Sequence, residues 1–78
     1  MLKDILIVDG YNVIFAWQSL KKLANESLEH ARMELRNQLL NYGKFKGYEV
    51  ILVFDGKYTK SIASIEEITK GFIEVYTD

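Results

Sequence analysis

Apolar residues along the chain fall into two short unbroken runs with a longer periodic stretch between them. Ile5 to Val8 and Val50 to Phe54 are the unbroken runs, which suit strands buried on both faces of a parallel sheet. In the stretch between them, apolar residues recur every three or four positions, at Leu28, Ala31, Leu35, Leu39 and Tyr42. This spacing predicts an amphipathic helix of about four turns. A strand, a helix and a strand in this order form a parallel, right-handed βαβ unit.

The ends of this helix have their own signals. Ser27, or alternatively Asn25, is suited to the N-cap, and Glu29 suits the first turn because acidic groups there face the positive end of the helix dipole. Gly43 is suited to the C-terminal stop. We therefore expect the helix to run from about residue 28 to about residue 42.

The other segments carry weaker patterns. Val13 to Trp17 is apolar and aromatic, and Gln18 to Asn25 has Leu20 and Leu23 three positions apart, so we expect a loop with about one helical turn. Isoleucines at three-residue steps predict a short second helix; they are Ile62, Ile65 and Ile68, with Glu66, Glu67 and Lys70 among them. Phe72 to Tyr76 is expected to be a third strand. The predicted fold class is α/β, one domain over residues 1–78 with about three parallel strands and flanking helices.

Composition narrows the class of protein. The chain has 78 residues, of which 49% are hydrophobic and 27% charged, a globular composition rather than a disordered one. It has no cysteine, which excludes disulfides and thiolate metal sites. No apolar run approaches the roughly 20 residues that span a bilayer, and no segment has the pattern of a signal peptide. We expect a soluble, cytoplasmic protein that does not bind membranes.

Charge gives no general sign of nucleic-acid binding, because the net charge is −1. A local basic patch is compatible with this total. Four lysines flank the second apolar run, Lys44, Lys46, Lys57 and Lys60. They form either such a patch or ordinary solvated loop positions, and the sequence leaves both interpretations open.

Each unbroken apolar run ends in an acid followed by a glycine. Asp9-Gly10 follows the first run, with Asn12 close behind, and Asp55-Gly56 follows the second. Parallel strands of a βαβ unit end at the same rim of the sheet, where open α/β folds bind their ligands. We therefore expect Asp9 and Asp55 to face one crevice. Gly10 lets the chain turn there without a side chain in the way.

Two carboxylates at one rim suit a hard divalent cation. Mg²⁺ takes oxygen ligands and commonly uses one or two protein carboxylates, with water and substrate phosphates completing its shell. Such an ion can activate a water for attack on a phosphodiester, and Asn12 would hold a phosphate or a metal-bound water. The alternative is that these acids cap helix N-termini or satisfy turn amides. Spacing by itself does not separate the two.

The residues at this rim also carry a family resemblance. The segments that carry it are Val8-Asp9-Gly10-Tyr11-Asn12-Val13-Ile14, Ala16-Trp17, Leu28-Glu29-x-Ala31-Arg32 and Val53-Phe54-Asp55. Together they resemble the YacP-like branch of the NYN domain family, a PIN-like group of ribonucleases that includes a ribosome-associated endoribonuclease. The Asp-Gly-Tyr-Asn segment is fairly specific, and the resemblance runs from Asp4 to Thr77.

The resemblance implies a three-layer, doubly wound α/β fold and an endoribonuclease that depends on Mg²⁺ or Mn²⁺. It implies that Asp9 and Asp55 are catalytic and bind the metal, and that Gly10, Asn12 and Arg32 contact the substrate. The implied partner is RNA, including mRNA on the ribosome.

The resemblance also implies that part of the family's fold lies beyond this sequence. Family members are about twice as long, and their later acids complete the metal cluster, so this chain corresponds to the N-terminal half of a domain. Without the later strands, Ile5 to Val8 would be an exposed edge that favours association, and we expect a homodimer or a larger assembly.

Two other functions stay open. The chain would be a non-catalytic module that binds RNA or the ribosome or self-associates, or a phosphoryl-transfer enzyme of another α/β family. Against the latter, no second Asp follows two residues after Asp9, and the chain has no Gly-x-Gly phosphate loop.

Overall fold

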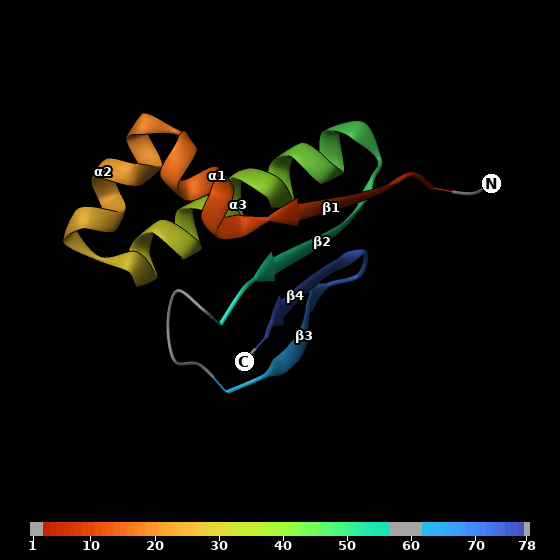
Figure 1. Ribbon diagram of the computed structural model, residues 1–78. Coiled ribbons are helices and arrows are strands. Elements are labelled where there is room, and N and C mark those ends of the chain that lie inside the picture. The colour runs from red at the N-terminus through yellow and green to blue at the C-terminus, as the bar shows by residue number, and fades with distance from the viewer. Residues whose placement is uncertain (1–2, 57–61, 78) are drawn as a thin grey trace.

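The computed structural model describes residues 3–56 and 62–77 as one mixed sheet of four strands with three helices (Figure 1). The strands are β1 Ile5–Asp9, β2 Glu49–Phe54, β3 Ser64–Thr69 and β4 Phe72–Tyr76, and the helices are α1 Gly10–Ala16, α2 Gln18–Glu26 and α3 Leu28–Lys46. The α/β class expected from the sequence is confirmed. No helix in this part of the chain combines the length and the apolar character that crossing a bilayer requires.

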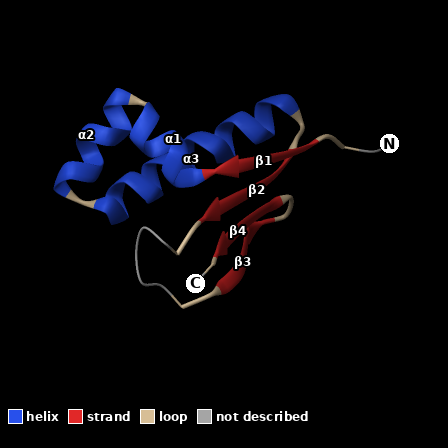
Figure 2. Cartoon of the chain, in the orientation of Figure 1, coloured by secondary structure: helices blue, strands red, loops and turns tan. Residues whose placement is uncertain are grey.

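The strands lie in the order β1-β2-β4-β3. β1 pairs with β2 in parallel, and β2 pairs with β4 in parallel, so the βαβ unit predicted from the two apolar runs is confirmed. β3 runs antiparallel to β4 and makes the sheet mixed (Figure 2). The carboxyl ends of β1, β2 and β4 therefore meet at one rim.

The short helix predicted around Ile65 and Ile68 is wrong, because this segment is the edge strand β3. A six-residue stretch with three-residue spacing cannot by itself separate a helix from a strand. The hairpin with β4 makes this segment a strand. Gly71 takes a φ of 87° and closes the turn, and β4 then supplies the backbone hydrogen-bond partners of β3. Ile62 lies before the strand.

The loop expected between residues 13 and 25 is also wrong. Asp9 caps α1 by accepting a hydrogen bond from the backbone N–H of Asn12, and α2 follows after a break at Trp17. Tyr11 and Ile14 of α1 and Leu20 of α2 are buried. These helices form because their few apolar side chains find partners in the core, as tertiary packing commonly supplies most of the stability of short helices.

Helix α3 begins where the sequence predicts and ends later. Ser27 is the N-cap and accepts a hydrogen bond from the backbone N–H of His30. The helix continues through Gly43 to Lys46, and Gly47 caps it in the left-handed conformation with φ 72°. Gly43 serves close packing instead, because a Cβ there would lie 3.0 Å from a methyl carbon of Val50.

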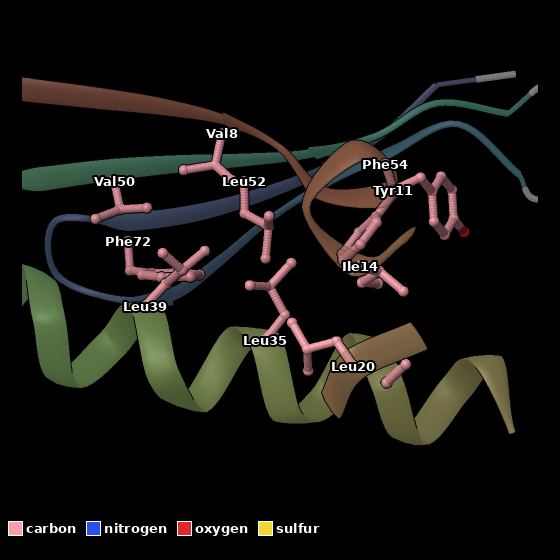
Figure 3. Packing of buried hydrophobic residues seen from close by; sticks show 11 residues of the cluster. Val8, Tyr11, Ile14, Leu20, Leu35, Leu39, Val50, Leu52, Phe54 and Phe72 are labelled. Carbon is pink, nitrogen blue, oxygen red and sulfur yellow. The ribbon is translucent and has the colours of Figure 1, made fainter. Parts of the chain in front are cut away.

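The core lies between the helices and one face of the sheet (Figure 3). Its side chains are Val8, Tyr11, Ile14, Leu20, Ala31, Leu35, Leu39, Val50, Leu52, Phe54 and Phe72. The two strands expected to be buried on both faces are covered on one face only by the described elements. Ile5 and Ile7 of β1 are 59% and 69% exposed, so the described part of the fold has two layers and β1 lies at its edge.

Candidate functional site

Asp9 and Asn12 form a locked pair at the carboxyl end of β1. One carboxylate oxygen of Asp9 accepts from the side-chain amide of Asn12 at 2.7 Å, and the other accepts from the backbone N–H of Asn12 at 3.4 Å. The amide nitrogen of Asn12 is committed to Asp9, so its amide oxygen is the atom free to accept from a water or to bind a cation. Both side chains are exposed, which leaves them accessible to a ligand.

Gly10 is required by the way α1 meets the sheet. A Cβ at this position would lie 2.4 Å from a ring carbon of Phe54, well inside van der Waals contact. The ring of Phe54 lies against Tyr11 as well, with centroids 5.0 Å apart. The glycine therefore brings the backbone of the Asp-Gly-Tyr-Asn segment directly onto the end of β2.

Asp55 follows β2 at the same rim. Asp9 is in register with Val53 on the neighbouring parallel strand, and Asp55 comes two residues later. Thr77 holds this end of β2: its backbone N–H donates to the carbonyl of Phe54 at 3.0 Å, and its hydroxyl accepts from the N–H of Gly56 at 3.2 Å. Asp9 and Asp55 therefore lie at the ends of adjacent strands. That their carboxylates face one crevice stays a prediction.

Arg32 reaches this region from α3. Its guanidinium donates a hydrogen bond of 3.3 Å to the hydroxyl of Tyr11, the tyrosine of the Asp-Gly-Tyr-Asn segment. Arg32 is half-buried, and in the described residues no carboxylate lies within ion-pair distance of it. Its remaining N–H donors can therefore bind phosphate oxygens.

One turn further along α3, Arg36 takes part in a buried network. Its Nε donates to Glu74 at 2.7 Å, and the hydroxyl of Tyr76 donates to the other oxygen of Glu74 at 2.9 Å. Glu74 is fully buried. Burial, followed by the hydrogen bond to Glu74, raises the pKa of Tyr76 to about 12, and the same carboxylate raises the pKa of Arg36. Both groups therefore stay protonated at neutral pH and act as donors.

The donor set at the rim fits a hard divalent cation in part. Asp9, Asp55 and the amide oxygen of Asn12 are oxygen ligands of the kind that Mg²⁺ and Mn²⁺ prefer. Within residues 3–56 and 62–77, no three histidine or acidic side chains converge on one point. The described residues therefore offer two carboxylates at one rim, and water and phosphate would have to complete the shell.

Tyr11, Thr77 and the Arg36–Glu74–Tyr76 network were not predicted as parts of the site. The sequence does contain a signal that Glu74 faces the core. Side chains alternate along β4, so Glu74 shares one face of the strand with Phe72 and Tyr76. No local signal marks Thr77, whose contacts with β2 exist only in the folded sheet. Of the four lysines proposed as a patch, Lys57 and Lys60 lie outside the described residues.

Comparisons with known proteins identify the family of the chain. The model of the YacP-like NYN domain matches residues 6–78. A curated relative, described as "Uncharacterized protein YacP" of Bacillus subtilis (strain 168), is 46% identical over 59 residues, which cover 76% of this chain and 35% of that protein. The match thus spans about a third of the length of the curated relative. No solved structure matches the chain significantly. The family model matches nearly the whole length of this chain, and the match includes the Asp-Gly-Tyr-Asn segment at the rim. The chain therefore belongs to the YacP-like NYN domain family.

Proposed function

We propose that this chain forms part of a metal-dependent endoribonuclease of the YacP-like NYN type, which hydrolyses phosphodiester bonds of RNA in the cytoplasm. The observation that carries the proposal is the locked Asp9–Asn12 pair beside Asp55 at the carboxyl rim of the sheet. Membership of the family supports a nuclease-type function. The proposed substrate is RNA, including mRNA on the ribosome.

In this proposal Asp9 and Asp55 hold Mg²⁺ or Mn²⁺, and Asn12 adds its amide oxygen or orients a bound water. When bound, the ion would lower the pKa of a water and offset charge on the scissile phosphate. The hydrogen bond of 2.7 Å from Asn12 keeps the Asp9 carboxylate in one orientation, so less reorganisation is needed when a cation arrives.

The other residues of the proposed site position the RNA. Gly10 is buried against the ring of Phe54, so in this proposal it acts by placing Asp9 and Asn12 at the rim where the RNA binds. Arg32, held by the Tyr11 hydroxyl at 3.3 Å, presents its remaining N–H donors to a phosphate oxygen. These roles give the residues of the Asp-Gly-Tyr-Asn segment and α3 a common ligand.

The alternative is a non-catalytic module that binds RNA or the ribosome or associates with itself. The exposure of Ile5 and Ile7 on β1 favours the last of these. β1 has a partner strand on one side only among the described elements, and such an apolar edge pairs readily with a second strand. We therefore propose a homodimer or larger assembly through β1, which is compatible with a nuclease.

Cleavage of labelled single-stranded RNA with Mg²⁺ or Mn²⁺ tests the proposed function. The informative variant is Asp9→Asn, because asparagine is as good an N-cap as aspartate; it removes the charge and one of the two carboxylate oxygens that accept from Asn12. We expect the variant to lose about 10²-fold or more in rate, as expected when one such electrostatic contact is removed. Asp4→Asn is the matched control, since Asp4 is exposed and precedes the other end of β1.

Two outcomes would contradict the proposal. Equal cleavage by the Asp9→Asn variant and the parent chain would mean that Asp9 does not hold the metal. RNA binding without cleavage by the parent chain, at any concentration of either ion, would favour the non-catalytic module.

A further inference from the structure

A cleft lies at the opposite end of the sheet from the acidic rim. It has a volume of about 410 Å³, within the range of small-ligand sites. It lies between the C-terminal turns of α3, the start of β2 and the β3–β4 turn, which lie together away from the acidic rim (Figure 1). Its lining residues are Lys3, Leu40, Asn41, Gly43, Lys44, Gly47, Tyr48, Val50, Thr69, Lys70, Gly71 and Phe72.

The charged side chains that line this cleft are lysines. Lys3, Lys44 and Lys70 come from three separate segments of the chain and line the same cleft, and no acidic residue lines it. All three lysines are exposed, so their ammonium groups can reach a ligand without a desolvation cost. Asp9 and Asp55 lie at the other end of the sheet. Glu49 lies just outside the cleft, where its Cγ would be 3.8 Å from a Cβ at Gly71, so the three lysines outnumber the acid beside them.

The floor of the cleft is apolar. Leu40, Val50 and Phe72 supply it, and Tyr48 stands at its side, fixed by an edge-to-face contact with Tyr42 at 6.0 Å between centroids. Three of the lining residues are glycines and add no side chain to the cleft, and a Cβ at Gly47 would lie in open space. An apolar floor beside an aromatic ring and a set of lysines suits a flat ring that carries a phosphate, as in nucleotide sites that combine stacking with backbone charge.

We propose that this cleft binds a nucleotide of single-stranded RNA, with the base on the apolar floor and the phosphate between the lysines. The inference rests on the proposed function only in naming RNA as the source of the nucleotide. β2 has six residues, so the cleft lies about 17–20 Å from the acidic rim at roughly 3.3 Å per residue. One RNA strand can thus be held at the lysine end while it is cleaved at the acidic end.

The backbone amide signals of the five glycines can show which end of the sheet binds RNA. Gly43, Gly47 and Gly71 line the cleft, whereas Gly10 and Gly56 lie at the acidic rim. Selective ¹⁵N-glycine labelling gives one amide signal for each. In EDTA, where a metal-dependent cleavage is blocked, titration with a short oligoadenylate should shift the signals of Gly43, Gly47 and Gly71. Titration with AMP separates a free nucleotide from the polymer as the ligand.

Paired lysine variants measure the charge contribution. Lys44→Ala with Lys70→Ala should weaken oligoadenylate binding about fivefold or more and lower the log–log salt slope by about 1.4, the expected loss for two phosphate contacts on a single strand. Lys21→Ala with Lys22→Ala is the matched control, because it removes the same charge from exposed positions of α2. Fluorescence anisotropy of labelled RNA at several salt concentrations gives both quantities.

Three other outcomes overturn the inference. It fails if the shifts are absent or confined to Gly10 and Gly56, or if both double variants weaken binding equally. If AMP binds as tightly as the oligoadenylate, the ligand of the cleft would be a free nucleotide and not RNA. Shifts at the three cleft glycines in a chain that does not cleave RNA would contradict the proposed hydrolysis alone and leave this cleft standing.

Discussion

Asp9 shows how one side chain takes part in both the fold and the proposed chemistry. Its carboxylate caps α1 through the backbone N–H of Asn12 and accepts from the amide of the same residue. The two interpretations that the sequence left open, a helix cap and a metal ligand, are therefore compatible, because the carboxylate is exposed and keeps further lone pairs. The cap is observed, and the metal role stays a prediction.

Gly10 is the residue whose replacement we expect to disturb the rim most directly. Gly10→Ala should destabilise the fold by about 1–3 kcal/mol, the usual cost of overpacking, because the new Cβ would lie 2.4 Å from the ring of Phe54. Urea denaturation measures the change. In a Phe54→Leu background the same substitution should cost less, since the clashing ring is gone; an equal cost in both backgrounds would place the strain elsewhere.

Among the elements, α3 and β4 are joined by the buried polar network as well as by apolar packing. Glu74 lies on the core face of β4, and Arg36 reaches it from α3 with 30% of its side chain still exposed. Removing Arg36 and removing Glu74 therefore have different consequences for the residue that remains. Arg36 can turn toward water, whereas Glu74 cannot.

This asymmetry gives an expected order of variant stabilities. Arg36→Met should cost about 3 kcal/mol, because it leaves a fully buried carboxylate without its cation. Glu74→Gln should cost about 1–2 kcal/mol, since the amide keeps an acceptor for Tyr76 and Arg36 is partly solvated. Free energies of unfolding from urea denaturation separate the two. Equal costs, or a larger cost for Glu74→Gln, would contradict the assignment.

At the scale of the whole molecule, the sheet carries apolar side chains on the face away from the described helices. Ile5 and Ile7 project from the edge strand, and Ile65 at the other edge is 77% exposed; Ile51, Val53, Ile73 and Val75 lie between them and are half-buried. A contiguous apolar surface of this kind marks an interaction site. It supports the proposed self-association through β1.

Ile7→Lys tests that association. We expect the variant to be monomeric by light scattering at high micromolar concentration, because a charge on an edge strand opposes pairing. Its free energy of unfolding per monomer should change by less than about 0.5 kcal/mol, as is usual at exposed positions. Ile62→Lys is the control, with the same change at a residue that is 90% exposed and precedes β3. A parent chain that is monomeric at this concentration would contradict the proposal.

What the sequence by itself determined is local or periodic. The unbroken runs gave β1 and β2, the three- and four-residue spacing gave the start of α3, and the Asp-Gly pairs at the run ends marked the rim, because these signals depend only on neighbouring residues. Ser27 as the N-cap of α3 belongs here as well.

The tertiary structure decided whatever depends on residues distant in the chain. β3 is a strand because β4 lies beside it, and α1 and α2 are helices because Tyr11, Ile14 and Leu20 find a core to enter. Gly43 lies inside α3 and makes room for Val50, and the helix ends at Gly47 instead, which takes the left-handed conformation. The cleft away from the acidic rim is lined by Lys3, Lys44 and Lys70, which come from three segments. These segments are far apart in the sequence and come together only in the folded chain.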